Sequence, residues 1–310
     1  MDPHEIIAQL VQNIERVIVG KTTAIKLCLA ALLSQGHILI EDVPGLGKTM
    51  LARALAASIS GTFRRIQFTP DLLPSDVTGV SIYNQKTQEF EPRTGPVFSH
   101  IVLADEINRT TPRTQSGLLE AMQEGRVTID GVTYKLPQPF FVMATQNPIE
   151  FHGTYPLPEA QLDRFLLKIN IGYPSEQAET AILERQLKGQ PIDQLEPVTD
   201  LAQILHLQRL VTDIYVSPDV LNFITKVVRC TRSHPDIALG ASPRGSLALT
   251  NVGRAVALLE HRDYVMPEDI KFLSPFVLSH RILLKAESEV EGKLREQVIS
   301  EILHSVAVPM

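Results

Sequence analysis

The residues best suited to chemistry in this chain are a lysine and a threonine that follow two closely spaced glycines in the segment PGLGKT, residues 44–49. Gly45 and Gly47 allow the backbone to curl, so that the N–H groups from Gly45 to Thr49 point at one anion. A helix that begins near Lys48 would add the positive end of its dipole. Lys48 would then reach the β- and γ-phosphates of a nucleotide, and the Thr49 hydroxyl would bind Mg²⁺.

The flanking sequence predicts the strand, loop and helix that a P-loop requires. HILI at 37–40 is a short apolar strand, and after Lys48 apolar residues recur every four positions on one helix face. Asp42 stands where the motif G-x-x-x-x-G-K-[ST] has its first glycine, and we expect the turn to survive because aspartate tolerates unusual backbone angles. An ordinary strand-to-helix turn with a lysine is the alternative. The predicted nucleotide-binding residues of this segment are Pro44, which has no N–H, and Gly45, Leu46, Gly47, Lys48, Thr49 and Met50.

Acidic and amide side chains follow two further apolar segments. In IVLADEINR, residues 101–109, apolar residues lead to Asp105 and Glu106, where a buried strand would end. In P-loop enzymes the acid that closes such a strand lies beside the P-loop. Asp105 would hold Mg²⁺ through water, while Glu106 would orient and deprotonate the attacking water. Asn147 follows the apolar segment 140–145 and could bind the γ-phosphate or that water, although such an asparagine is more often a turn former.

Composition limits the class of protein. The chain has 310 residues, 44% hydrophobic and 21% charged, enough for a buried core and for two domains. A net charge of −6 gives no global basic field for nucleic acid or anionic membrane. Cys28 and Cys230 have no metal-ligand spacing and are expected to be buried thiols. The acidic N-terminal sequence and the lack of a membrane-length apolar run predict a cytoplasmic protein without membrane insertion.

The remaining periodicity predicts the elements that hold these residues. Residues 63–68 and 166–171 are two more strands, and 79–93 and 127–136 are β-hairpins, the second around Asp130-Gly131. Gly172 begins the most plausible domain boundary, because no strand pattern follows it. Beyond it the pattern is helical, over 176–188, 200–213, 218–231, 244–260, 267–283 and 287–305.

Together these features resemble the MoxR family of AAA+ ATPases over nearly the whole chain. The matching segments are EDVPGLGKT (41–49), FTPDLLPSDVTG (68–79), LADEINR (103–109), ATQNP (144–148), LPEAQLDRF (157–165) and GASPR (240–244). The resemblance implies an α/β fold, a P-loop AAA+ five-stranded parallel sheet flanked by helices at 1–172, with a smaller all-α lid domain at 173–310. It also implies ATP and Mg²⁺ bound in a homo-oligomeric ring, usually hexameric.

The resemblance further assigns roles to single residues. Asn147 would be the sensor asparagine, Arg164 the finger that reaches the neighbouring subunit's nucleotide, and Arg244 the lid arginine at the γ-phosphate. VIVG at 17–20, including Val19 and Gly20, would line the adenine. The two hairpins would be the inserts that face the pore or a client.

Both arginines have alternatives in the local sequence. Arg164 follows Asp163 and could pair with it inside the subunit. Arg244 follows Pro243 at the start of a helix, where the dipole mildly disfavours a cation, and this favours an external anion as its partner.

Four functions use such machinery. The leading one is an ATP-driven, chaperone-like remodelling ring that acts on protein clients, by resemblance often with a von Willebrand factor A domain protein. A metal-chelatase motor subunit is the alternative. A nucleic-acid motor is disfavoured, because the tip at 84–89 has one lysine against one glutamate and the tip at 129–132 is acidic. A small-molecule kinase would not be expected to carry Arg164 or the helical C-terminal domain.

Overall fold

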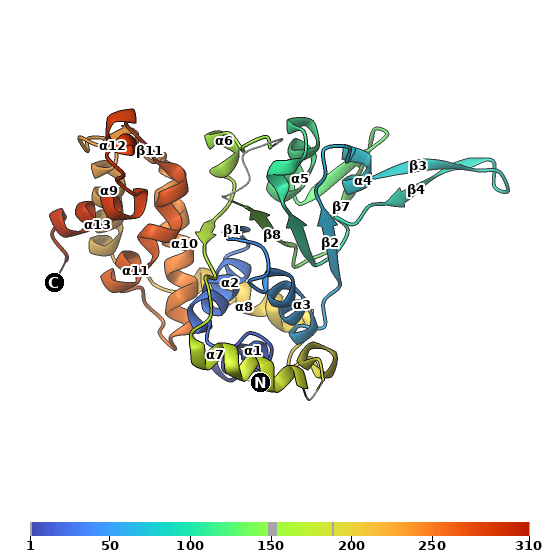
Figure 1. Ribbon diagram of the computed structural model, residues 1–310, viewed down its shortest axis with the longest axis horizontal. Helices are drawn as coiled ribbons and strands as arrows, with labels where there is room; N and C mark the ends of the chain where they lie inside the picture. The colour runs from blue at the N-terminus through green and yellow to red at the C-terminus, as the bar shows by residue number, and fades with distance from the viewer. Residues whose placement is uncertain (1, 148–153, 188, 310) are drawn as a thin grey trace.

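The fold is built on a five-stranded sheet in the order β2-β5-β8-β1-β9 (Figure 1). The computed structural model describes residues 2–147, 154–187 and 189–309. All neighbouring strand pairs in this sheet are parallel. The strands are β1 (Ile38–Glu41), β2 (Phe63–Gln67), β5 (Ile101–Asp105), β8 (Phe141–Gln146) and β9 (Leu167–Ile169). The predicted five-stranded parallel sheet is therefore confirmed, with strand ends within a few residues of their expected positions.

Alternation along the central strands directs side chains into two hydrophobic clusters. In β1, Ile38 and Ile40 belong to one cluster and Leu39 to the other. The same division separates Leu103 from its neighbours in β5 and Met143 from its neighbours in β8. Because these strands are buried on both faces, they appear in the sequence as continuous apolar runs.

Helices cover both faces of the sheet. The first cluster contains residues of α1 (Pro3–Glu15), α2 (Thr22–Leu33) and α3 (Lys48–Ser58). The second contains residues of α4 (Pro74–Thr78) and α5 (Pro112–Glu124). A short helix, α6 (Glu159–Leu162), precedes the edge strand β9, and a 3-10 turn, η1 (Ile107–Arg109), follows β5.

Both predicted hairpins are present. Strands β3 (Gly79–Asn84) and β4 (Glu89–Thr94) pair in an antiparallel arm that projects from the body at the end opposite the C-terminal helices (Figure 1). Strands β6 (Arg126–Ile129) and β7 (Val132–Lys135) form the second hairpin. Its turn residues Asp130 and Gly131 both have positive φ, 47° and 83°, as a type I′ turn requires.

The C-terminal half is mainly helical, as expected. Its elements are α7 (Glu176–Leu187), η2 (Pro191–Gln194), α8 (Leu201–Asp213), α9 (Pro218–Cys230), β10 (Ile237–Leu239), α10 (Pro243–Leu259), α11 (Pro267–Leu278), η3 (Ser279–Arg281), β11 (Leu283–Leu284), α12 (Ala286–Val290) and α13 (Arg295–Ser305).

Three details of the helical prediction are wrong. The helix predicted over 267–283 ends at Leu278, and the following residues form η3 and β11. The pair β10 and β11 is a small antiparallel sheet that was not expected, because strands this short show no periodicity. The helix predicted over 287–305 is broken at Gly292, whose φ of +79° is left-handed.

The C-terminal helices pack against the sheet domain through α2. The first hydrophobic cluster continues from α2 into α8 and α10 without interruption. Lys26 of α2 forms an ion pair with Glu260 at 2.7 Å, and Ser34 donates to the carbonyl of Asn251. The boundary at 172 remains a prediction. Among the described residues, no helix combines the length and hydropathy that crossing a membrane requires.

Candidate nucleotide-binding site

The backbone of residues 44–49 has the curled form that the glycines predict. Gly45 and Gly47 have φ of +87° and +84°, and α3 begins at Lys48 directly afterwards. A Cβ atom added to Gly45 would meet nothing within 4 Å, so conformation and not crowding requires glycine there. The N–H groups at the start of α3 are therefore exposed toward an anion.

Asp42 behaves differently from the expectation that placed it in an unusual backbone conformation. It does not have a positive φ, and its carboxylate is buried. That carboxylate accepts the N–H of Ile171 at Oδ2 and that of Gly172 at 3.3 Å from each oxygen. Asp42 therefore ties the start of the P-loop to the segment that leaves β9, which a glycine could not do.

A polar cavity of about 350 Å³ lies at the carboxyl ends of β1, β5 and β8. It brings together nine of the predicted residues, and five of these have polar side chains, Lys48, Thr49, Asp105, Glu106 and Asn147. Pro44, Gly45, Gly47 and Met50 also line it, as do Arg65 and Thr145, which the sequence reasoning did not single out.

Lys48 lies over the loop that precedes it. Its Nζ donates to the carbonyl oxygens of Asp42 at 2.6 Å and Val43 at 3.1 Å. Burial lowers the pKa of Lys48, and the negative charges of Asp42, Asp105 and Glu106 partly oppose that shift. Among the described residues, these two neutral carbonyls are the hydrogen-bond acceptors of the ammonium, which would gain from an incoming phosphate because phosphate is a stronger acceptor.

Asp105 is held on both oxygens. Arg65 of β2 donates to Oδ2 from Nε at 3.0 Å and Nη2 at 2.6 Å, and the Thr145 hydroxyl donates to Oδ1 at 2.6 Å. Arg65 was a missed residue, although β2 precedes β5 in the chain and ends beside it in the sheet. Arg65 is two residues before Gln67, so the two side chains lie on the same face of β2 near its end, and this spacing could have identified Arg65.

Glu106 has a left-handed backbone, with φ of 58°, which is uncommon for a residue other than glycine. Its N–H donates to the hydroxyl of Thr145 at 2.8 Å. Gln67 donates to Oε2 at 2.6 Å, and Nε of Arg109 lies 3.3 Å from the same oxygen. Because both contacts use Oε2, Oε1 is the oxygen better placed to take a proton.

The donor set fits a nucleotide with Mg²⁺. Hard oxygen ligands, the hydroxyl of Thr49 and the carboxylate of Asp105, stand on the wall of the same cavity as the helix N-terminus and Lys48. Since both oxygens of Asp105 already accept hydrogen bonds, this residue suits a water-mediated contact better than a direct one.

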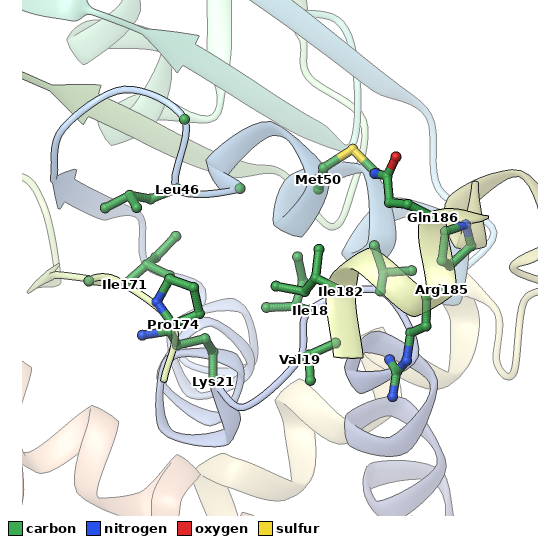
Figure 2. A pocket seen from close by; sticks show the side chains of 15 residues that line it. Ile18, Val19, Lys21, Leu46, Met50, Ile171, Pro174, Ile182, Arg185 and Gln186 are labelled. Carbon is green, nitrogen blue, oxygen red and sulfur yellow. The ribbon is translucent and has the colours of Figure 1, made fainter. Parts of the chain in front are cut away.

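A second cavity, of about 250 Å³, is mostly apolar and shares Gly45, Gly47 and Met50 with the polar one. Figure 2 shows it between Leu46, Ile171 and Pro174 on one side and Ile18, Met50 and Ile182 on the other. Val19, which the family resemblance predicts to line the adenine, lines this cavity. Gly20 is not among the lining residues, and a Cβ there would lie 3.1 Å from that of Ala178 in α7. The contributions of α7 were missed.

Arg164 and Arg244 are placed apart from both cavities. Neither lines the polar cavity; Arg164 instead lines a recess with α5 and the β6–β7 hairpin. Asp163 does not pair with Arg164. It binds Arg281 at 2.8 Å, and Arg244 lies 3.7 Å from its other oxygen. Within the described part of the chain, the guanidinium of Arg164 has no ion pair or hydrogen bond, so the intra-subunit alternative loses its partner.

One further group of potential metal ligands lies in the C-terminal helical region. His234, Asp236 and Glu301 offer ligand atoms within 4.8 Å of one another. Lys293 and Ser288 already donate to Asp236, at 2.9 and 2.8 Å, and the two acids face different nitrogens of His234. An ammonium in contact with this group favours a structural ion-pair network over a metal centre.

Comparisons with known proteins agree with this geometry. The model of the ATPase family associated with various cellular activities (AAA) matches residues 37–167, and that of the AAA lid domain matches 229–302. The uncharacterized protein YeaC of Bacillus subtilis is 57% identical over 309 residues, covering 100% of this chain and 97% of that protein. Chaperone MoxR1 of Mycobacterium tuberculosis is 44% identical, covering 96% and 81%. A solved structure of a candidate ATPase from Cytophaga hutchinsonii has a TM-score of 0.93 at 41% identity, covering 99% of this chain and 96% of that one.

Proposed function

The chain belongs to the MoxR family of AAA+ ATPases, and from this we propose that it hydrolyses MgATP as a ring whose subunits complete one another's active sites. The observation that carries the proposal is the division of the predicted catalytic residues. Lys48, Thr49, Asp105, Glu106 and Asn147 line one cavity, whereas neither Arg164 nor Arg244 lines it. Arg164 follows Asp163 in the chain and lines a separate recess, and Arg244 lies 3.7 Å from the Asp163 carboxylate.

Within one subunit the residues have separable tasks. The N–H groups of Gly45 to Thr49 and the Lys48 ammonium bind phosphate oxygens. Mg²⁺, held by Thr49 and, through water, by Asp105, would neutralise phosphate charge. Glu106 accepts the proton of the attacking water, and Asn147 orients that water or the γ-phosphate. The adjoining apolar cavity suits a flat, weakly polar base, which supports adenine as the base bound there.

The arginines supply what this cavity lacks. A guanidinium with no partner inside its own described chain can bind a phosphate presented by another subunit, where it would stabilise charge in the transition state. Arg244 lies 3.7 Å from the carboxylate of Asp163, the residue before Arg164, so we assign both arginines to the neighbouring subunit's nucleotide. A hexamer is the expected ring, by family resemblance.

Protein clients fit the projecting hairpin better than nucleic acid does. Val80, Ile82, Tyr83 and Phe90 are exposed on the β3–β4 arm, and the last two rings are in edge contact at 5.4 Å. The relative from M. tuberculosis is named a chaperone. We propose a chaperone-like remodelling role, with von Willebrand factor A domain proteins as a partner class. The cytoplasmic location and the exclusion of nucleic acid remain predictions.

Mixing two inactive variants tests whether Arg164 of one subunit acts at the nucleotide of another. Arg164→Ala should lose about 10³-fold or more in turnover while it still binds ATP, and Lys48→Ala should not bind ATP. In a mixed ring, an intact Arg164 from the Lys48→Ala subunit can face the intact P-loop of the Arg164→Ala subunit. We therefore expect partial recovery of phosphate release on mixing, and nucleotide-dependent assembly in sizing experiments.

Three results would contradict the proposal. They are a monomer at every concentration with ATP, full activity of Arg164→Ala, and no recovery between subunits shown to exchange. The last of these would remove the trans role of Arg164 while leaving ATP binding in place.

A further inference from the structure

A buried arginine of the C-terminal helical region forms hydrogen bonds with the turn that carries Arg164. Arg281, at the end of η3, has a side chain only 3% exposed. Its Nε donates to Oδ1 of Asp163 at 2.8 Å, and Nη2 donates to the carbonyl of Phe165 at 2.7 Å. Weaker contacts reach the carbonyls of Asp163 and Leu166 at 3.4 and 3.3 Å, and Nη1 also donates to the carbonyl of Val277.

These acceptors lie on both sides of Arg164 in the chain. Asp163 precedes it, and Phe165 and Leu166 follow it, so one guanidinium fixes the backbone before and after the finger. Phe165 is fully buried, and the N–H of Leu166 donates to the carbonyl of His37 beside the edge of the sheet. The side chain of Arg164 is the part of this turn left without a partner among the described residues.

The same carboxylate is a contact for the start of α10. Arg244 lies 3.7 Å from Oδ2 of Asp163, and the hydroxyl of Ser242 donates to that oxygen at 3.4 Å. Asp163 is thus shared by Arg281 and the segment that carries Arg244. A movement of the C-terminal helices must move the Arg164 turn with it, or else break these bonds.

We propose that Arg281 is a positioning residue for catalysis in trans: it locks the turn that carries Arg164 to the C-terminal helices, so that Arg164 and Arg244 approach the neighbouring subunit's nucleotide as one unit. The inference rests on the proposed function, since it requires a ring in which Arg164 acts on a neighbour.

The chemistry of the site suits arginine and not lysine. A guanidinium offers five N–H donors in a planar fork, and here they are divided between a carboxylate and backbone carbonyls. Burial lowers the pKa of Arg281 to about 10, with Asp163 opposing that shift, so the side chain stays charged at neutral pH. A lysine at this position keeps the charge but can satisfy fewer of these acceptors.

The chain provides a matched control. Arg262 is also a poorly exposed arginine of the C-terminal helices and binds Asp269 at 2.6 Å, but its hydrogen bonds stay within that region. Arg281→Lys and Arg262→Lys therefore both weaken an ion pair in the same region, and only the first touches the Arg164 turn. Asp163→Asn weakens the same contact at its acceptor, because it removes the carboxylate charge that Arg281 and Arg244 share.

Arg281→Lys is expected to bind ATP within about twofold of wild type and to lose about 10- to 100-fold in kcat, with KM little changed, because the finger is misplaced. Amide hydrogen exchange without nucleotide should accelerate in residues 159–167 of this variant. Arg262→Lys should change neither kcat nor exchange in that segment.

Subunit mixing separates positioning from general damage. Arg281→Lys mixed with Lys48→Ala should recover activity as Arg164→Ala does, because the intact finger comes from the other subunit. The double variant Lys48→Ala/Arg281→Lys mixed with Arg164→Ala should not recover, since no site receives both an intact P-loop and a positioned finger.

Two results would overturn the role of Arg281 while leaving the trans role of Arg164 in place. The first is full activity of Arg281→Lys. The second is that Lys48→Ala restores activity to Arg164→Ala but not to Arg281→Lys. If mixing Arg164→Ala with Lys48→Ala restores no ATPase activity, the proposed trans function is wrong, and this inference is wrong with it. Should Arg281→Lys not fold, Asp163→Asn decides by the same assays, with the same expected and contradicting results.

Discussion

The polar cavity and the cluster around Asp163 are built in different ways. The polar and charged residues of the cavity come from the ends of neighbouring strands β2, β5 and β8 and from the start of α3. The cluster joins the turn before β9 to η3, and Asp163 and Arg281 are 118 positions apart in the chain. Parallel strands bring their ends together automatically, whereas the cluster exists only because the C-terminal helices dock where they do.

The two regions also differ in how their charges are satisfied. In the cavity, Asp105 is bound by Arg65, and Glu106 is bound by Gln67 and Arg109. Around Asp163, Arg281 is fully occupied, while Arg164 has no partner in the described chain. These differences support the proposal that the first region is a reaction centre inside one subunit and that the second offers Arg164 to a neighbouring subunit.

The largest expected effect separates chemistry from binding in the cavity. Glu106→Gln keeps the side-chain size but removes the base, so hydrolysis should fall about 10²- to 10⁴-fold. ATP affinity should remain near wild type, because the P-loop and Lys48 are unchanged. Phosphate release and binding of a fluorescent ATP analogue measure the two quantities.

Glu287→Gln, on an exposed residue of α12, is the control and should be fully active. Hydrolysis by Glu106→Gln at the wild-type rate would show that the base lies elsewhere and would remove the distinction between the two regions. If the variant traps ATP as expected, its pull-down in ATP should retain the client.

The next largest effect is expected at Thr145, which holds the two acids of the cavity in place. Its buried hydroxyl accepts the N–H of Glu106 and donates to Asp105, so one oxygen orients both acids. Thr145→Val keeps the shape and should lower kcat about 10- to 100-fold with ATP affinity preserved. Thr145→Ser retains the hydroxyl and should restore most of the rate. Equal rates for the two variants would show that the hydroxyl has no such role.

The cavity could be predicted from sequence because its residues lie in short motifs at strand ends. PGLGKT and the Asp105-Glu106 pair each follow an apolar run, and the parallel sheet then places them side by side. The two hairpins were equally accessible through alternation and the Asp130-Gly131 turn.

The partners that orient these residues were not predictable in the same way. Arg65, Gln67 and Thr145 act through contacts between strands, and Arg281 acts through the docking of a distant element. Nothing in the local pattern around Arg281 distinguishes it from a surface arginine. The broken helix at Gly292 and the short β10–β11 sheet were missed because each depends on a few residues in a tertiary context.

A third effect concerns Asp42, which links the P-loop to the segment after β9. Asp42→Gly restores the strict motif, yet it should destabilise the fold by about 2 kcal/mol, because the N–H groups of Ile171 and Gly172 lose a charged acceptor. Asp42→Asn keeps one acceptor oxygen and should lose less. Urea denaturation measures both. A glycine variant as stable as wild type would show that this link has no stabilising role.

The smallest effect compares one buried histidine from each region. Burial lowers the pKa of His37, just before β1, to about 4, from an ordinary 6.5. Burial and the adjacent Arg281 lower the pKa of His280 well below 6.5. Both pKa values are depressed in the folded state, so the unfolded chain binds more protons below pH 6.5. Stability is therefore complete above that pH and is lost as the pH falls.

Between pH 7.5 and 5.5 each histidine should remove about 1 kcal/mol from the free energy of unfolding. Urea denaturation at the two pH values should show this loss in wild type, and His37→Gln or His280→Gln should each reduce it by about half. His206→Gln, on an exposed histidine, should leave it unchanged. If only His37→Gln reduces the loss, His280 is not held neutral. Because His280 lies 2.7 Å from Arg281, that result would mean that the junction around Asp163 opens more readily than the sheet beneath the cavity.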